Sequence, residues 1–195
     1  MRKERVMRHK ASLVIALFCV SLISAPTISA HAESPKPKTT TVSNKKAEKI
    51  RCQVTKATAQ TPARVAPPNS ILKRFPKTIT LDTNCGEIVI QTMARQAPVT
   101  VTVMATLARN GFFDNTLCHR LTTEGIYVLQ CGDPTATGTG GPDFRYVDEN
   151  LPTAGKNNYP EGTVAMANSG PPGTNGSQFF LVYKNTTLGP NYTLS

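Results

Sequence analysis

The stretch that decides the fold runs Met-Ala-Asn-Ser-Gly at 166–170, Pro-Pro-Gly-Thr at 171–174 and Asn-Gly-Ser-Gln-Phe-Phe at 175–180. Its small-residue first part and its aromatic last part predict two strands, and the prolines and glycine between them predict a turn. A strand with small side chains then lies beside a strand that carries an amide and aromatic rings. We expect such a surface to be shallow and to hold an extended peptide and an apolar ring without any nucleophile.

Residues upstream of this stretch supply the other chemistry of the predicted surface. Arg120 offers a guanidinium, the run Tyr-Val-Leu at 127–129 an apolar wall, and Gln130 a second amide. Taken alone, Arg120 fits a surface or salt-bridging arginine better than a functional one, and the apolar residues fit a core. Glycines at 138, 140 and 141 do not have GxGxxG spacing and no predicted helix follows them, so nucleotide binding is not expected.

Alternation of apolar and polar residues from 78 onward predicts a mainly β domain. Apolar residues alternate on both sides of Asn-Cys-Gly at 84–86, which indicates a hairpin. Further strands are expected at 116–121, 126–131, 162–167 and 177–183, with a long loop at 132–160. An antiparallel barrel or sandwich with one or two helices is the expected architecture.

The segment from 98 to 108 fits two kinds of secondary structure. Its valines at 99, 101 and 103 alternate as in a strand, whereas Val103, Met104, Leu107 and Ala108 recur at helical spacing. Proline at the start and Asn-Gly at 110–111 are typical of helix ends, so a helix is favoured.

The N-terminus has the pattern of an export signal. Five basic residues precede an apolar run from 11 to about 25, and Ala-His-Ala follows at 30–32. This order predicts a secretory signal peptide at 1–32 that is cleaved after Ala32, and an uncleaved anchor is the alternative. The expected location is outside the cytoplasm, either secreted or at the cell surface.

Charge is distributed unevenly along the chain. Residues 1–32, 33–77 and 78–195 carry net charges of +4, +9 and −3, which together give +10. Basic character therefore lies outside the predicted domain, and a nucleic-acid partner is not expected. The segment 33–77 is rich in Lys, Thr, Pro and Ala, which predicts a disordered linker. Its charge either keeps it extended or gives it weak contact with an anionic cell wall or membrane surface.

Four cysteines follow the predicted signal: Cys52, Cys85, Cys118 and Cys131. An even number in an exported chain permits two disulfides with three possible pairings. Cys118 and Cys131 flank a predicted hairpin and are the first candidate pair, and free thiols are the alternative. Because paired CxxC spacing and nearby histidines are missing, no metal site is expected.

Several of these motifs, in this order, resemble the cyclophilin family of peptidyl-prolyl isomerases, in a form like the exported bacterial proteins. The similar segments cover about 78–195 and are 97–114, 118–120, 130–141, 144–149 and the stretches around Asn168 and Gln178. The resemblance implies an antiparallel β-barrel with a capping helix. The chain has two residues more than the common family spacing between Arg120 and Gln130. It also stops before the family's last strands and second helix, so we expect a weakly stable, poorly active fragment.

The resemblance assigns roles to eleven residues. Arg120 matches the catalytic arginine, and the substrate-binding matches are Tyr127, Val128, Gln130, Ala167, Asn168, Ser169, Gln178, Phe180, Leu188 and Tyr192. Tyr127, Val128, Phe180 and Leu188 match a proline pocket, and Tyr192 stands where the family has a histidine. His119 neighbours Arg120 on the predicted strand, so it points to the opposite face and is expected to be structural.

Two functions follow from this resemblance. The first is a peptidyl-prolyl cis-trans isomerase that acts on proline-containing peptides and unfolded exported proteins, as a monomer and without a cofactor. The second is a module that binds proline peptides without turnover. Rotation about an X-Pro bond transfers no proton, so isomerase activity requires only a group that stabilises the twisted bond.

Overall fold

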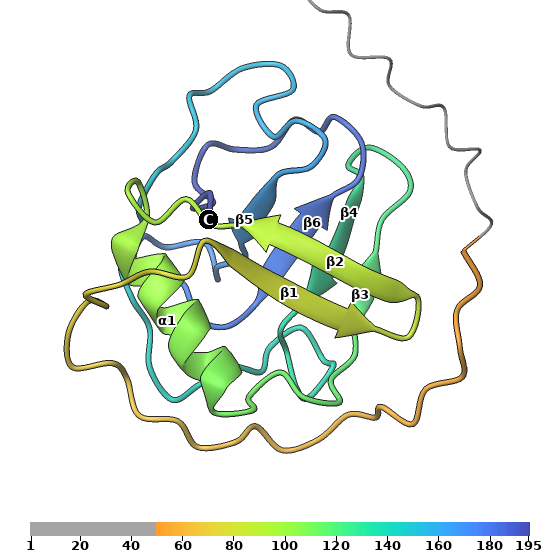
Figure 1. The fold of residues 1–195 in the computed structure, drawn as a ribbon. Helices are drawn as coiled ribbons and strands as arrows, with labels where there is room; N and C mark the ends of the chain where they lie inside the picture. The colour runs from red at the N-terminus through yellow and green to blue at the C-terminus, as the bar shows by residue number, and fades with distance from the viewer. Residues whose placement is uncertain (1–49) are drawn as a thin grey trace, which may run out of the picture. The chain divides into compact units, whose positions relative to one another are not determined.

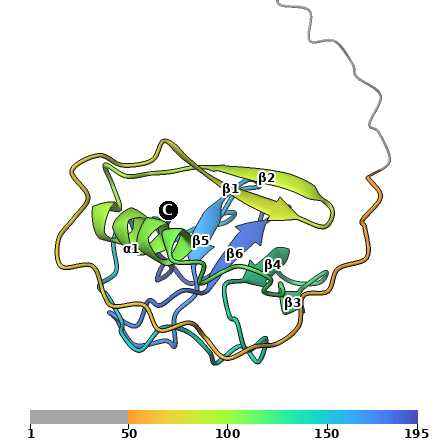
Figure 2. The same ribbon diagram turned by 60° about the horizontal axis from the view of Figure 1, so that its bottom comes forward.

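The computed structural model describes residues 50–195, which belong to one compact unit. The predicted signal peptide at 1–32 and the first part of the predicted linker lie outside the described residues. The unit contains six short strands and one helix (Figures 1 and 2). In chain order these are β1 (Thr78–Thr83), β2 (Gly86–Gln91), α1 (Pro98–Arg109), β3 (Arg120–Leu121), β4 (Val128–Cys131), β5 (Val164–Met166) and β6 (Phe179–Val182). The prediction of a mainly β fold with antiparallel strands and a helix is confirmed.

The first two strands form the predicted hairpin. β1 and β2 pair in register from Thr78 opposite Gln91 to Thr83 opposite Gly86. Gly86 has a φ of +109°, a conformation that residues with a side chain rarely adopt, and it closes the turn. Leu81 packs against the main core, and the hairpin lies over the second sheet in both views (Figures 1 and 2).

The second sheet has four strands in the order β3-β4-β6-β5, all antiparallel to their neighbours. The strands lie within the predicted ranges but are shorter. β3 has only two residues, and the first residue of its predicted range, Thr116, lies in a turn in which its N–H bonds to the carbonyl of Phe113. The long loop at 132–160 contains no helix or strand, as expected.

The ambiguous segment at 98–108 forms helix α1. Pro98 occupies its first turn, and its buried face includes Val101, Val103 and Leu107. A carboxylate from the long loop completes its N-terminus: Glu149 accepts hydrogen bonds from the N–H groups of Val99 and Thr100. Negative charge at a helix N-terminus is favourable because four N–H groups there have no partner within the helix.

Two apolar clusters fill the interior. The larger one joins α1 to the sheets and contains Val103, Leu107, Phe112, Cys131, Tyr146, Met166 and Phe179. The smaller one contains Val128, Tyr159, Ala165, Phe180 and Val182, with Ile126, Leu188 and Tyr192 packed against it. This second cluster lies under the candidate site.

Residues 50–77 have no helix or strand, but they contact the domain at several points. A disulfide joins Cys52 to Cys85 at the hairpin tip, and the side-chain amide of Gln60 donates to the carbonyl of Asp114. The N–H of Leu72 donates to the Thr102 hydroxyl at 3.1 Å. Figure 1 shows this segment running around the outside of the domain. The part of the expected linker that the structure describes is therefore extended but attached.

A second disulfide joins Cys118 to Cys131, which confirms the first candidate pair. Within residues 50–195, no helix is long and apolar enough to cross a bilayer.

Candidate functional site

The site begins as one row of residues across the four-stranded sheet. Arg120 of β3 is opposite Gln130 of β4, Gln130 is opposite Phe180 of β6, and Phe180 is opposite Ala165 of β5. Directly opposite residues lie on the same face of a sheet. The register therefore brings a guanidinium, an amide and an aromatic ring together from three separate segments of the chain.

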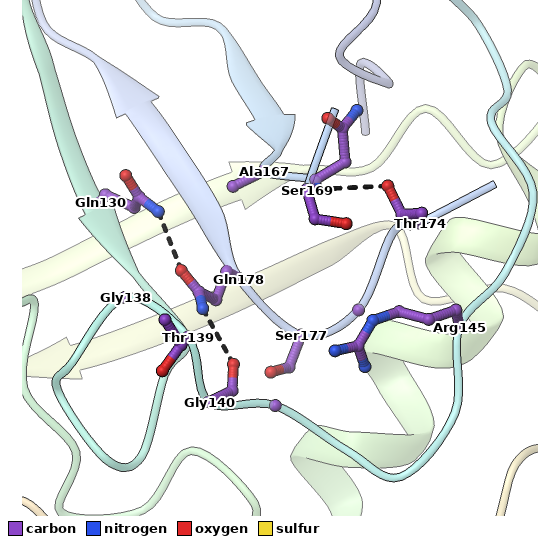
Figure 3. A pocket seen from close by; sticks show the side chains of 13 residues that line it. Gln130, Gly138, Thr139, Gly140, Arg145, Ala167, Ser169, Thr174, Ser177 and Gln178 are labelled. Atoms are coloured by element: carbon purple, nitrogen blue, oxygen red, sulfur yellow. Dashed lines mark hydrogen bonds between the residues drawn. The ribbon is translucent and has the colours of Figure 1, made fainter. Parts of the chain in front are cut away.

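Hydrogen bonds orient the polar members of this row. Arg120 Nη1 donates to Gln130 Oε1 at 3.1 Å, and Gln130 Nε2 donates to Gln178 Oε1 at 2.8 Å. Gln178 Nε2 then donates to the carbonyl of Gly140 at 2.8 Å, as Figure 3 shows for the two glutamines. A guanidinium can only donate, so its neighbour Gln130 must present oxygen to it and NH2 to the far side. The arginine is thereby held at the surface with a fixed orientation.

Beside Arg120 lies a notch of about 220 Å³, lined mostly by apolar side chains, with polar groups from Gln130 and Asn168. Phe180 is 5 % exposed, and the ring of Tyr192 meets it edge-on with centroids 5.5 Å apart. The hydroxyl of Tyr159 holds the rim in place, since it donates to the carbonyl of Gly189 and accepts from the N–H of Tyr192. Burial raises the pKa of Tyr159 above its ordinary value, so the hydroxyl keeps its proton. A notch with apolar walls and a cation at one edge suits a small apolar ring attached to a polar backbone.

The edge at 167–169 separates the notch from a second cavity. The N–H of Ala167 donates to the carbonyl of Gln178, and the side-chain amide of Asn168 donates to the carbonyl of Asn191 at 2.7 Å. Asn168 thus ties this edge to the segment that carries Tyr192. Ala167, Asn168 and Gln130 line both cavities, which makes them neighbours on one surface.

The second cavity has a volume of about 230 Å³ and is lined mainly by glycines and by residues with polar side chains (Figure 3). One wall is the glycine-rich loop at 138–141, which is folded around the buried carboxylate of Asp133. That carboxylate accepts from the N–H groups of Thr135, Gly138 and Gly140. Burial alone would raise the pKa of Asp133, but a hydrogen bond from the Thr135 hydroxyl and those from the backbone N–H groups outweigh it and hold the pKa below the ordinary value of 3.8. The loop is therefore organised by a charge that stays ionised.

The structure brings together most of the residues that the sequence predicted. Those that line the notch are Arg120, Val128, Gln130, Ala167, Asn168, Phe180, Leu188 and Tyr192. Gln178 and Ser169 line the adjoining second cavity. His119 lines neither cavity, and both of its ring nitrogens are buried without a hydrogen-bond partner among the described residues.

Tyr127 is the exception, because it lines neither cavity. Its ring packs against Tyr183 at 6.0 Å between centroids, and Lys184 Nζ lies 4.3 Å above it. Ile126 lines the notch instead. Ile126 and Tyr127 precede β4, so strand alternation does not decide which of them reaches the notch. No separate signal in the sequence pointed to Ile126.

Arg145 was also missed, although it lines the second cavity. It lies in the segment 144–149, which resembles the family, but the resemblance gave it no role, and the folding of the long loop brings it to the site.

Comparison with known proteins identifies the family of this chain. The family model described as "Cyclophilin type peptidyl-prolyl cis-trans isomerase/CLD" matches residues 78–193. The chain belongs to the cyclophilin family.

Individual relatives agree with this assignment. The chain is 42% identical over 158 residues to a protein named "Probable peptidyl-prolyl cis-trans isomerase B" from Mycobacterium leprae, which covers 74% of this chain and 53% of the relative. A protein of the same name from Mycobacterium tuberculosis is 43% identical over 130 residues, or 60% of this chain and 41% of the relative. The chain thus spans about half the length of the curated relatives it matches.

A solved structure with the same fold is the cyclophilin-type peptidyl-prolyl cis-trans isomerase of Cryptosporidium parvum in the presence of the dipeptide Ala-Pro. It has a TM-score of 0.53 and 32% sequence identity, and the match covers 60% of this chain and 75% of that one.

Proposed function

We propose that this chain is a peptidyl-prolyl cis-trans isomerase that binds proline in the notch at Phe180 and uses Arg120 to speed rotation of the X-Pro bond. The observation that carries the proposal is the position of Arg120. Its guanidinium is fixed by Gln130 at the edge of an apolar notch. Family membership, the names of the relatives and the Ala-Pro dipeptide of the solved neighbour support the same activity and substrate class.

Catalysis of X-Pro rotation requires little of the protein other than a correctly placed positive charge. Rotation about the amide bond has a barrier of about 18–20 kcal/mol, because the planar form is stabilised by resonance. In the twisted form the proline nitrogen regains its lone pair and accepts a hydrogen bond better than in the planar form. A cation placed to donate to that region therefore stabilises the twisted bond more than either isomer, which lowers the barrier.

The expected clients are exported proteins. Both disulfides of the described residues support this part of the proposal, because structural disulfides form and persist in oxidising compartments. The predicted signal at 1–32 points in the same direction. Measuring the mass of the protein recovered from the medium and from the cell surface tests both location and cleavage. Recovery only from the cytoplasm, at full mass, would contradict export.

Activity can be tested by NMR exchange spectroscopy on an Ala-Pro tetrapeptide. We expect Arg120→Ala to reduce the catalysed exchange rate by about 10²-fold, the size typical of removing one charge-stabilising group. Arg120→Lys should recover little of this, because an ammonium lacks the planar donor fork. Arg95→Ala serves as the control, since Arg95 is exposed and lines neither cavity. Equal rates for wild type and Arg120→Ala would remove Arg120 from the mechanism.

A binding module without turnover is the second candidate. Its support is the exposure of Arg120, since water screens an exposed charge and weakens its effect on a bound peptide. The same experiment separates the two. If the wild-type chain binds the peptide but does not raise its exchange rate above the uncatalysed rate, the binding module is the correct description.

A further inference from the structure

We propose that four cations beside helix α1 form a surface that binds an anionic phospholipid bilayer and leaves the candidate site open. We call these residues the basic face: Lys73, Arg74, Lys77 and Arg95. None of them lines the notch or the second cavity. The inference therefore does not rest on the proposed isomerase activity, and its test is independent of turnover.

The segment 72–77, which carries three of the four cations, is fixed along the first half of α1. At one end the N–H of Leu72 donates to the hydroxyl of Thr102 in the helix, and at the other end the N–H of Thr92 donates to the carbonyl of Lys77 at 3.0 Å. Figures 1 and 2 both show the segment that leads into β1 passing beside the helix. Each of these contacts uses main-chain groups or a threonine hydroxyl, not a basic side chain.

The same contacts gather the four cations in one place. Lys73, Arg74 and Lys77 are all exposed within the fixed segment. Arg95 is also exposed, and it lies three residues after Thr92, whose N–H is bonded to residue 77. Three residues span at most about 11 Å, so Arg95 is close to Lys77. The basic face is thus a cluster on the folded domain and not a run of charge along a free chain.

Charge is divided unevenly within the described part of the chain. Residues 50–113, which include the basic face, contain eight Lys or Arg and two Asp or Glu, for a net charge of +6. Residues 114–195, which supply every residue that lines the candidate site, contain four Lys or Arg and seven Asp or Glu, for a net charge of −3. An anionic surface therefore attracts the part of the chain with the basic face and not the part with the site.

Carboxylates around the basic face leave most of its charge uncompensated. Asp82 and Glu87 are opposite each other in the hairpin, and Asp82 is five residues along the chain from Lys77. Five residues of a strand span about 16 Å, which exceeds the Debye length of about 8 Å at physiological salt. Glu149 lies at the start of α1, but its oxygens accept from the N–H groups there, so the helix N-terminus offsets its charge.

Exposed apolar side chains at the same place favour a bilayer over a dissolved polyanion. Ile71 is 49% exposed and directly precedes the fixed segment, and Met93 is 36% exposed and lies two residues before Arg95. At a bilayer surface basic side chains meet anionic headgroups while neighbouring apolar side chains reach the acyl boundary. A dissolved polyanion offers the charge without the apolar phase. The predicted signal at 1–32 would also bring the chain to a membrane during export.

Tryptophan fluorescence of the full chain tests where a bilayer makes contact, because the chain contains no tryptophan of its own. Ile71→Trp places a probe next to the basic face, and Leu121→Trp places one on the exposed strand β3. Vesicles of phosphatidylcholine alone are compared with vesicles of phosphatidylcholine and phosphatidylglycerol in equal parts. We expect the emission of Ile71→Trp to shift to shorter wavelength only with the anionic vesicles, and the emission of Leu121→Trp to stay unchanged.

Two results of this comparison would overturn the proposal. One is an equal shift of the two probes, which would show contact without a preferred face. The other is no shift of Ile71→Trp, and this is also the result expected if only the predicted signal at 1–32 enters the vesicles.

Charge variants made in the Ile71→Trp chain identify the source of the contact. The first variant removes three cations of the basic face: Lys73→Gln, Arg74→Gln and Lys77→Gln. The matched control removes three exposed cations elsewhere: Arg109→Gln, Lys156→Gln and Lys184→Gln. The first variant should partition into the anionic vesicles about 10²-fold more weakly, since each cation near an anionic bilayer contributes about fivefold. Partitioning of the parent chain should also weaken as the salt concentration rises.

The control variant should partition nearly as the parent chain does. Equal weakening of the two triple variants would show an effect of net charge alone and would overturn the proposal. Urea denaturation of both variants shows that each is folded under the conditions of the vesicle experiment.

Inorganic polyphosphate distinguishes a bilayer from other polyanions. We expect it to leave the emission of Ile71→Trp unshifted, because it has no apolar phase to receive the ring. An equal shift with polyphosphate and with anionic vesicles would show a site for anionic polymers and would overturn the assignment to a bilayer.

Discussion

Asp133 shows how a single residue sets the shape of one wall of the site. Its carboxylate is buried, and the loop N–H groups of Thr135, Thr137, Gly138 and Gly140 converge on it. A Cβ on Gly140 would collide with this carboxylate, so only glycine fits there. The loop conformation therefore depends on the charge of the Asp133 carboxylate and on glycine at position 140.

Asp133→Asn should lower the free energy of unfolding by about 1–3 kcal/mol near neutral pH, because hydrogen bonds to a charged acceptor are replaced by weaker ones. The pKa of Asp133 is lower folded than unfolded, so its contribution is present above the ordinary value of 3.8 and is lost as the pH falls through the lower folded pKa. The difference between wild type and variant should thus shrink below about pH 4. Urea denaturation at pH 7 and pH 3 measures it, and a difference that is equal at both values would contradict this account.

Helix α1 shows the same dependence on distant residues at the scale of an element. Its own N-cap residue, Ala97, makes no side-chain cap. The carboxylate of Glu149 takes that place, with an additional bond from the Thr100 hydroxyl at 2.9 Å. The long loop therefore forms one wall of the site and also caps the N-terminus of α1.

Glu149→Gln should lower the free energy of unfolding by about 0.5–2 kcal/mol, the range measured for loss of a helix cap. Urea denaturation with unchanged m-value is the measurement. Glu161→Gln is a matched control, since Glu161 is exposed and makes a hydrogen bond only through its main-chain N–H. Equal destabilisation by the two substitutions would show that loss of negative charge, and not capping, is responsible.

Elements with a local signal could be predicted from the sequence. The hairpin at 78–91 follows from alternation around a turn, and α1 follows from proline at its start and Asn-Gly at its end. Most of the site followed from resemblance of ordered motifs, because residue types alone favoured core or surface roles. Tyr127 was expected at the notch, whereas its ring packs against Tyr183 and Ile126 lines the notch. Glu149 and Arg145 lie in the segment 144–149, which resembles the family, but their hydrogen-bond partners could not be predicted because they depend on how the loop folds.

At the scale of the whole molecule, the two disulfides within residues 50–195 hold segments at different distances from the site. The Cys118–Cys131 bridge closes a separation of 13 residues around β3 and β4, next to Arg120 and Gln130. The Cys52–Cys85 bridge spans 33 residues and attaches the extended segment to the hairpin tip. We expect the first to support the domain and the second to hold the segment 50–77 in place.

The two bridges should therefore respond differently to removal. The double substitution of Cys118 and Cys131 by serine should lower the free energy of unfolding by about 2–4 kcal/mol, measured by urea denaturation. Replacing Cys52 and Cys85 together should leave exchange activity near the wild-type value but speed trypsin cleavage after Arg51 and Lys56. Mass spectrometry of timed digests follows the cleavage. Unchanged digestion of that double variant would show that the other contacts of the segment suffice to hold it.

The amides between Arg120 and the glycine loop have a direction as well as a position. Each glutamine presents oxygen toward the arginine and nitrogen away from it, so turning one amide over would place like groups face to face on both sides. A glutamate at 130 would gain an ion pair with Arg120 yet set a carboxylate oxygen against the oxygen of Gln178. Gln178 would then have to rotate and give up the carbonyl of Gly140. The nearly isosteric substitution Gln130→Glu would consequently alter the hydrogen bonding of Gly140, at the far wall of the second cavity.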